Sequence, residues 1–193
     1  MNLFLHGPIG VGKSTLLQEA LAPVVSSVGG IFTQRIQESG KTVGYRTVLL
    51  NGASLPVETE FSHDLEGVFL LNGQRNVETL EDVILQVERL IQSPAVRLVL
   101  LDEIGGIELM SGVFWDTLRR ILVTGKPCVG VYKSADNIKH MSTVLKLSTE
   151  YLELHEEMRQ LISRNGTLVE LTNDNRESVR SDLVQSIRSQ IRI

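Results

Sequence analysis

The feature that most constrains the fold of this chain is a glycine-rich stretch near its N-terminus, residues 7–14, which reads GPIGVGKS. It matches the phosphate-binding loop pattern G-x-x-x-x-G-K-[ST] at every fixed position. Glycines let the backbone approach a phosphate closely, and successive N–H groups then form a concavity that binds anions. The pattern therefore predicts that Lys13 reaches the β- and γ-phosphates of a nucleotide and that the hydroxyl of Ser14 binds Mg²⁺.

The residues on either side of this loop supply the context that the motif needs. Leu3–Leu5 is a short apolar run typical of a buried strand, and apolar residues between Leu16 and Leu21 recur at helical spacing. A helix that starts at the loop adds the positive end of its dipole. A surface turn without a ligand is the alternative, but this context favours nucleotide binding. The residues expected to bind the nucleotide here are Gly7, Pro8, Gly10, Val11, Gly12, Lys13, Ser14 and Thr15.

Composition and charge narrow the class of protein further. The chain has 193 residues, of which 42% are hydrophobic and 22% charged, which predicts one compact domain over residues 1–193. The net charge of −4, with no basic block, indicates no nucleic-acid partner. No signal peptide and no apolar run of about 20 residues is present, so we expect no membrane segment. The single cysteine, Cys128, is expected to be buried and inert, and the cytoplasm is the expected location.

The region after the first helix predicts an antiparallel hairpin. Two β-rich runs, residues 31–36 and 42–50, flank a short polar turn that contains a glycine. A simple nucleotide-binding core more often continues strand, helix, strand, so this hairpin is a distinguishing insertion. Beyond it we expect a polar loop with a short strand near Leu55–Val57, a strand at residues 67–71 and a helix from Val77 to about Gln92.

The second half of the chain predicts a parallel sheet covered by helices. The run at residues 96–101 is apolar on both faces, as in a central parallel strand. The pattern between residues 134 and 147 indicates no particular structure. The other expected elements are a helix at 113–122, a strand at 126–132, a helix at 150–163, a strand at 167–171 and a final helix that includes Val179. This succession predicts an α/β fold.

An acidic pair, Asp102-Glu103, follows the central strand directly. The ends of parallel strands meet the phosphate loop at one edge of the sheet, so Asp102 is expected to support Mg²⁺ through its waters. Glu103 can polarise a water for in-line attack on the γ-phosphate. A kinase has less use for such a group, because it must keep water away from the phosphate. Alone, the pair could merely cap a surface strand; beside a phosphate loop, it favours chemistry.

Several stretches resemble one known family. Residues 102–109, DEIGGIEL, resemble the D-E-I-G-x-x-E-L signature of the cancer-related nucleoside-triphosphatase family of P-loop proteins. The first stretch, residues 7–15, is similar to the family's G-P-x-G-V-G-K-[ST]-T start. Residues 30–33, 43–45 and 172–176 resemble its G-F-[YF]-T strand, its [IV]-G-[FY] return and its T-x-E-N-R motif. The order and spacing of these motifs hold over nearly the whole chain.

This resemblance implies a RecA-like, three-layer P-loop fold with a mostly parallel sheet and antiparallel additions. It also implies Mg²⁺-dependent hydrolysis of the β–γ bond of nucleoside triphosphates, such as ATP and GTP, with little base selectivity. The implied roles are metal support for Asp102, water activation for Glu103 and nucleotide contacts for Asn175 and Arg176. For the last two residues the alternative is a helix N-terminus, with Asn173 or Asp174 as the cap and Arg176 on a solvated face. Phosphate binding is the implied role of Gly10, Gly12, Lys13, Ser14 and Thr15.

The chain also departs from the family pattern. It has Gln34 and Arg35 where the family's hairpin strand carries acidic residues, and Gln37 where a basic residue is usual. Gly106 stands where the signature often has a lysine that could stabilise charge on the γ-phosphate. Such a charge changes rates by orders of magnitude, and Arg35 is a candidate replacement. These departures bear on turnover, which is expected to be slow, more than on nucleotide binding.

Two alternative functions remain open on the sequence. A small-molecule or nucleotide kinase shares the phosphate loop, but residues 134–163 lack the arginine-rich lid common in kinases. A regulatory module that binds nucleotide and turns it over little is the alternative of another class. The guanine-recognition motif N-K-x-D is absent from the sequence, and a monomer is the expected form.

Overall fold

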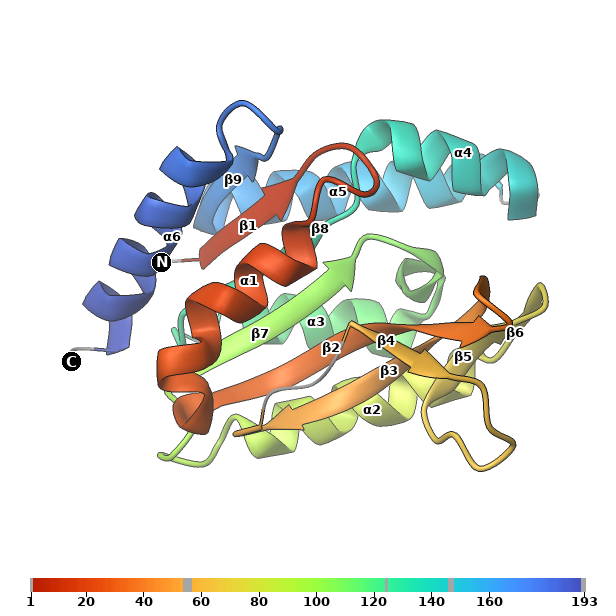
Figure 1. The fold of residues 1–193 in the computed structure, drawn as a ribbon, viewed down its shortest axis with the longest axis horizontal. Helices are drawn as coiled ribbons and strands as arrows, with labels where there is room; N and C mark the ends of the chain where they lie inside the picture. The colour runs from red at the N-terminus through yellow and green to blue at the C-terminus, as the bar shows by residue number, and fades with distance from the viewer. Residues whose placement is uncertain (1, 54–56, 124, 146–147, 192–193) are drawn as a thin grey trace.

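The computed structural model describes residues 2–53, 57–123, 125–145 and 148–191, and the strands among them form a nine-stranded sheet (Figure 1). The strand order is β6-β5-β3-β2-β7-β8-β1-β9, and β4 pairs with β2 outside this path. Neighbouring strands from β2 through β7, β8 and β1 to β9 are parallel, so the expected mostly parallel sheet is confirmed. The strands are β1 (Asn2–His6), β2 (Val28–Glu38), β3 (Lys41–Asn51), β4 (Glu58–Glu60), β5 (Val68–Leu71), β6 (Gln74–Arg75), β7 (Leu98–Ile104), β8 (Cys128–Tyr132) and β9 (Gly166–Glu170).

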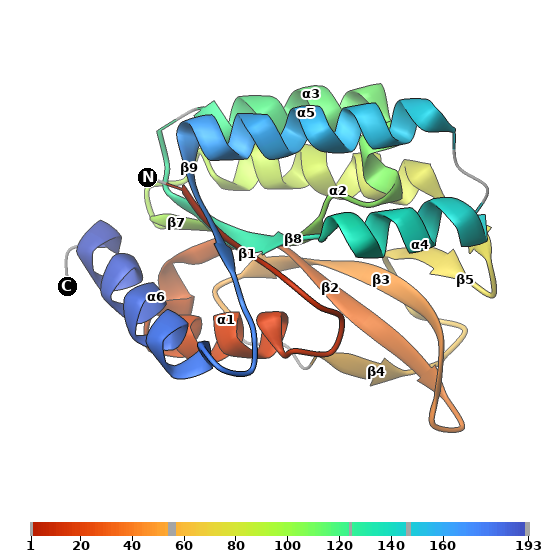
Figure 2. The ribbon, with the colours of Figure 1, turned by 90° about the horizontal axis from the view of Figure 1, so that it is seen from above.

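Helices cover both faces of this sheet and make three layers. Figure 2 shows α2, α3 and α5 on one face and α1 and α6 on the other. The helices are α1 (Lys13–Leu21), α2 (Val77–Leu90), α3 (Gly112–Val123), α4 (Ala135–Leu145), α5 (Thr149–Asn165) and α6 (Arg176–Ile191), with 3₁₀ turns η1 (Ala22–Ser27) and η2 (Ile107–Met110). None of these described helices combines the length and apolarity required to cross a membrane.

The central strand β7 shows why the sequence folds this way. Val99 and Leu101 pack into the core under α2, α3 and α5, whereas Leu98 and Leu100 pack into the core under α1 and α6. Because successive side chains of a strand point to opposite faces, a strand covered on both faces must be apolar throughout. The expected central strand is therefore confirmed.

The expected hairpin is confirmed and is longer than the sequence indicated. β2 and β3 pair from Gly29 opposite Asn51 to Glu38 opposite Lys41. At its start β2 also pairs with β7, and Gly30 makes that approach possible: its φ is +146°, and a Cβ there would lie 1.9 Å from the carbonyl oxygen of Leu100. This glycine joins the antiparallel insertion to the parallel sheet.

Some boundaries differ from the sequence expectation. Of the short strand expected near Leu55–Val57, residues 55 and 56 lie outside the described residues, and the observed strand is β4, directly after it. The segment that indicated no structure contains α4. β7 continues through the acidic pair to Ile104, whereas the sequence predicted that the strand ends at the pair. The last of these differences shapes the site.

Candidate active site

The phosphate loop lies between β1 and α1, as the motif predicts. Its glycines have the positive φ angles that other residues resist: +135° at Gly7, +80° at Gly10 and +83° at Gly12. Gly7 is also tightly packed, because a Cβ there would lie 2.3 Å from the carbonyl oxygen of Leu171. The ammonium of Lys13 donates hydrogen bonds to the carbonyls of Gly7 (3.0 Å) and Pro8 (2.7 Å), so it lies over the loop itself.

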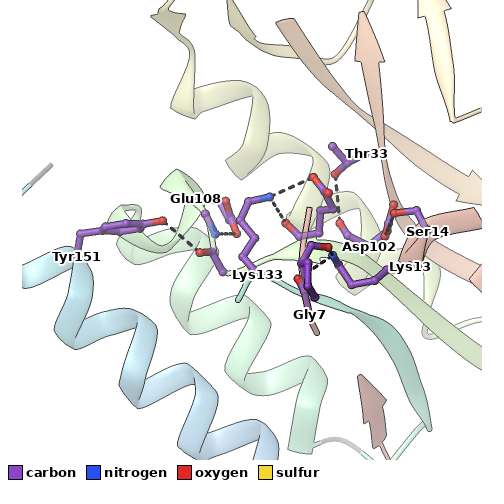
Figure 3. A network of polar contacts seen from close by, with 12 residues as sticks. Gly7, Lys13, Ser14, Thr33, Asp102, Glu108, Lys133 and Tyr151 are labelled. Atoms are coloured by element: carbon purple, nitrogen blue, oxygen red, sulfur yellow. Dashed lines mark hydrogen bonds and ion pairs between the residues drawn. The ribbon is translucent and has the colours of Figure 1, made fainter. Parts of the chain in front are cut away.

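The acidic pair of β7 meets the phosphate loop at one edge of the sheet, as expected (Figure 3). The Ser14 hydroxyl donates a hydrogen bond to Oδ1 of Asp102 at 3.0 Å. The Thr33 hydroxyl, from β2, donates to the backbone carbonyl of Asp102 at 3.2 Å. Residues from α1, β2 and β7 are thereby tied together at the place where Mg²⁺ was expected.

The second carboxylate oxygen of Asp102, Oδ2, is buried and has no hydrogen-bond partner among the described residues. Burial raises the pKa of Asp102 to about 7, and the negative charge of Glu103 adds to this effect, while the hydrogen bond from Ser14 opposes it. A buried carboxylate with one unpaired oxygen is costly unless a cation or a donor reaches it. Its surroundings therefore suit a metal ion or the water bound to one.

Glu103 has an unusual backbone. Its φ is +56°, in the left-handed region that a glutamate rarely adopts. The pairing of β7 with β8 shifts register between Leu101 and Ile104, so Glu103 lies in an irregularity of the sheet. Such irregularities re-aim side chains and recur beside active sites. Here the Glu103 side chain lines a cavity that also contains Lys13.

Lys133, directly after β8, is the main residue of the site that sequence reasoning missed. Its ammonium donates to the Glu103 carboxylate and to the Glu103 backbone carbonyl, both at 3.2 Å. The charge of Lys133 holds the pKa of Glu103 below its usual value, although burial acts in the opposite direction. A signal existed: like Asp102, Lys133 follows a predicted parallel strand, and such strand ends share one edge of the sheet.

The signature residue Glu108, to which the sequence assigned no role, closes the turn after β7. Its Oε1 accepts a hydrogen bond from the backbone N–H of Gly106 at 2.6 Å, and burial raises its pKa. On the far side of this turn, the hydroxyl of Tyr151 in α5 donates to the carbonyl of Gly105 at 3.2 Å (Figure 3). These two contacts fix the path of the backbone beside Lys133.

The two C-terminal candidates, Asn175 and Arg176, have different surroundings. The Asn175 carbonyl accepts the first helical hydrogen bond of α6, from Val179 (2.9 Å), and its side-chain amide donates to the Glu170 carbonyl (2.8 Å). Asn175 is therefore the helix cap, a role that the sequence alternative gave wrongly to Asn173 or Asp174.

Arg176 does not lie on a solvated face, so that part of the alternative is also wrong. Its guanidinium donates to the carbonyl of Val11 in the phosphate loop at 2.9 Å. A Cβ at Gly12 would lie 2.5 Å from the same guanidinium. Arg176 thus packs against the loop, close to where a nucleotide was expected.

Arg35, considered as a replacement for the signature lysine, forms an ion pair with Glu58 of β4 at 2.9 Å, and both side chains are about half exposed (46% and 49%). The two glutamines of the hairpin are also paired: Gln34 accepts from Arg46 at 2.7 Å, and Gln37 donates to Thr42 at 3.1 Å. The two glutamine contacts therefore join β2 to β3, whereas the Arg35 pair joins β2 to β4, and Arg35 also lines the cavity of the site.

A cavity of about 500 Å³ joins these groups. Its charged end is formed by Lys13, Asp102, Glu103 and Lys133. The lining also includes apolar side chains from β2, β3, β5, α2, η2 and α3, which are Ile31, Tyr45, Phe69, Leu80, Ile107 and Phe114. α6 covers the opposite face of the sheet from α2 and α3 (Figure 2), and its first residue, Arg176, contacts the phosphate loop at the carbonyl of Val11.

Comparison with known proteins decides the family. A family model described as NTPase matches residues 2–184. The chain belongs to this NTPase family. Membership confirms the expected class of enzyme, a nucleoside-triphosphate hydrolase, and the resemblance noted in the sequence.

Among curated relatives of this NTPase, the cancer-related nucleoside-triphosphatase homolog of Mus musculus is 34% identical, and the match covers 97% of each chain. The cancer-related nucleoside-triphosphatase of Homo sapiens is 28% identical over the same shares. The solution structure of a human cancer-related nucleoside triphosphatase superposes with a TM-score of 0.64 at 26% identity and 97% coverage of both chains. A crystal structure of THEP1 from Aquifex aeolicus, at 22% identity, 96% and 98% coverage and a TM-score of 0.61, agrees in fold.

Proposed function

We propose that this NTPase hydrolyses the β–γ bond of a Mg²⁺-bound nucleoside triphosphate by in-line attack of a water that Glu103 activates. The observation that carries the proposal is the meeting of three groups at one cavity. Lys13 of the loop, the Ser14–Asp102 hydrogen bond and the Glu103 carboxylate all lie at the same edge of the sheet. Cation, metal-supporting pair and base are the parts that phosphoryl transfer to water requires.

The arrangement supports one direction for the triphosphate. The loop N–H groups and the start of α1 would hold the phosphates, with Lys13 on the β- and γ-phosphates. Glu103 lines the cavity together with Lys13, and Arg176 contacts the loop from α6, a helix on the opposite face of the sheet from α2 and α3. The γ-phosphate would then face Glu103. The nucleoside would lie toward Thr15, which is exposed, and toward Arg176, which is partly buried.

The residues present fit a magnesium ion. Ser14 and Asp102 offer a hydroxyl and a carboxylate, and Oδ2 of Asp102 is buried without a partner. The described residues contain no cluster of three His, Cys, Asp or Glu side chains that could form a metal cage. Magnesium usually keeps several waters and takes its other ligands from substrate phosphates, so one such pair is enough. When bound, the ion neutralises charge on the phosphates.

Glu103 suits the role of general base. Its carboxylate stays ionised, because the charge of Lys133 lowers its pKa, and an ionised carboxylate can accept a proton from water. The same ion pair competes with water for the carboxylate, which supports a slow turnover. Since the contacts that support binding are to phosphates, we also propose that ATP, GTP and other nucleoside triphosphates serve as substrates.

A second function has one specific observation in its favour. The cavity of about 500 Å³ that Glu103 lines is also lined by Tyr45 and Phe69, and it offers more space than one water needs. A small acceptor molecule there would meet the γ-phosphate from the attacking side, as in a kinase. Glu103 would then accept a proton from a hydroxyl of the acceptor instead of from water.

One experiment tests the proposal and separates the two functions. Phosphate release is measured for a panel of nucleoside triphosphates with Mg²⁺, in the presence and absence of small alcohols and phenols. We expect release without any acceptor, similar rates across bases, and loss of all release in excess chelator. Undiminished hydrolysis in chelator would overturn the magnesium proposal, and phosphate transfer that requires an acceptor would favour the kinase.

A further inference from the structure

We propose that Lys133 is a second catalytic cation of this NTPase, one that contacts the γ-phosphate oxygens during hydrolysis and takes the place of a charged side chain at position 106. The inference goes beyond the family's activity, and it rests on the proposed direction of the triphosphate. Four features of the structure support it: the anchoring of the Lys133 backbone, the partners of the Lys133 side chain, the space around Gly106, and the distance from Lys133 to the general base.

The backbone of Lys133 is held on both sides at the end of β8. Its N–H donates to the carbonyl of Ile104 at 2.9 Å, and its own carbonyl lies 3.1 Å from Nε2 of His155. The His155 ring stacks on Tyr132, with centroids 4.7 Å apart, and the Tyr132 hydroxyl donates to the His155 carbonyl at 2.5 Å. A lysine on a mobile loop would lack this support, so Lys133 is pre-organised.

The partners of the Lys133 side chain leave it a donor for substrate. The side chain is only 12% exposed, which is unusual for a lysine. Burial lowers its pKa, but the charges of Glu103 and Glu108 more than offset burial, so the ammonium stays charged. An ammonium has three N–H donors, and the bonds it makes within the described residues use two of them, both on Glu103.

The surroundings of Gly106 show which side chain occupies this part of the site. A Cβ built at Gly106 would lie 2.9 Å from Cε of Lys133 and 2.6 Å from Oε2 of Glu108. The backbone angles of Gly106 are φ −102° and ψ −149°, so its φ lies outside the left-handed region. Its lack of a side chain leaves the space that the lysine from β8 fills.

The chemistry needs a cation at this place. As the water oxygen bonds to the γ-phosphorus, the bond to the β–γ bridging oxygen breaks, and the bridging oxygen leaves with the electron pair on the nucleoside diphosphate. One proton of the water passes to Glu103, and Lys133 keeps its own. Lys133 lies 3.2 Å from the carboxylate that receives the proton. In the proposed direction of the triphosphate, its ammonium therefore lies beside the oxygens of the γ-phosphate. A cation in that position is worth about 10³–10⁵-fold in other phosphoryl-transfer enzymes.

The test compares Lys133→Ala, the double variant Lys133→Ala/Gly106→Lys and Lys126→Ala. Lys126 is the matched control, because its ammonium donates to the carbonyls of Ser93 (2.7 Å) and Val96 (2.6 Å) away from the cavity. We expect single-turnover hydrolysis to fall at least about 100-fold in Lys133→Ala. We expect an unchanged rate in Lys126→Ala and at least a tenfold recovery in the double variant.

A second readout separates catalysis from a structural role. Mg²⁺–nucleoside diphosphate with aluminium fluoride mimics the phosphoryl group in transfer. Lys133→Ala should bind the diphosphate alone as the parent does and should lose most of the extra affinity that aluminium fluoride adds. Hydrolysis at the parent rate in Lys133→Ala would overturn the assignment. A lower rate would also overturn it if aluminium fluoride still enhanced diphosphate binding in Lys133→Ala and the double variant recovered no activity. Glu103→Gln assayed beside it keeps the two proposals apart, since a parent rate there contradicts the general-base role of Glu103 instead.

Discussion

The two sides of the proposed γ-phosphate position are built in different ways. On the loop side, residues 7–14 are one contiguous stretch that leads into the first turn of α1. Its glycines have positive φ angles, and its donors are backbone N–H groups and the ammonium of Lys13. On the attack side, Glu103, Glu108 and Lys133 come from β7, η2 and the end of β8. The contacts on this side are made by their side chains, such as the ion pair between Lys133 and Glu103. The loop side therefore depends on local backbone geometry, and the attack side on the tertiary fold.

This difference predicts a division of labour. Groups of the loop side meet the phosphates both in the bound substrate and in the transition state, so they serve binding and catalysis alike. Groups of the attack side act on the water and on charge that develops as it attacks, so they serve the transition state alone. Only interactions that strengthen in the transition state accelerate the chemical step.

The largest effect is expected for Lys13→Ala on the loop side. Removal of this charge should lower kcat/KM by about 10³–10⁵-fold, by analogy with other cations on a transferred phosphoryl group. Nucleotide affinity should fall together with the rate, because Lys13 contacts the phosphates before and during the reaction. Single-turnover hydrolysis and equilibrium titration with a nucleotide measure the two quantities. A variant that loses rate alone would place Lys13 with the attack side and break the division.

The next effect is expected for Glu103→Gln on the attack side. The amide keeps the shape of the side chain but cannot accept the proton of the water, so general-base assistance of about 10²–10⁴-fold should vanish. The single-turnover rate, measured at saturating Mg²⁺–nucleotide, reports this loss directly. Hydrolysis at the parent rate would show that another group activates the water.

Smaller effects are expected from a pair of glycine substitutions that compares the two sides in stability. Gly7→Ala puts a Cβ 2.3 Å from the carbonyl of Leu171 at a φ of +135°, so it should destabilise the fold by about 2–4 kcal/mol. Gly106→Ala first meets the side chains of Glu108 and Lys133 rather than backbone atoms, so it should cost less than about 2 kcal/mol. Urea denaturation of both variants measures the difference. Equal losses would contradict the contrast between backbone and side-chain construction.

The same contrast explains what could be predicted from the sequence. The phosphate loop, the hairpin and the apolar run that leads to Asp102 were all predictable, because each is written in contiguous residues with a known period or motif. Lys133 was missed although it follows a predicted strand, because its contact with Glu103 at 3.2 Å depends on the strand order, which places β8 beside β7 and is not written in the neighbouring residues. The cap at Asn175 was missed by one or two residues, as helix ends often are.

The positive φ of Glu103 was also beyond sequence reasoning. A glutamate in an apolar strand gives no local sign of a left-handed backbone, and the register shift that goes with it depends on pairing with β8. Arg35 stays a candidate charge for the phosphate. Its guanidinium pairs with Glu58 on β4, and the same residue lines the cavity and helps to lower the pKa of Glu103.

The division between the two sides is tested most directly by the nucleotide affinity of Glu103→Gln beside that of Lys13→Ala, measured by equilibrium titration with one Mg²⁺–nucleoside triphosphate. The account predicts an affinity within about threefold of the parent for Glu103→Gln, because the carboxylate acts on the water and not on the bound substrate. It predicts a loss of at least about tenfold for Lys13→Ala. Equal losses of affinity in the two variants would contradict it.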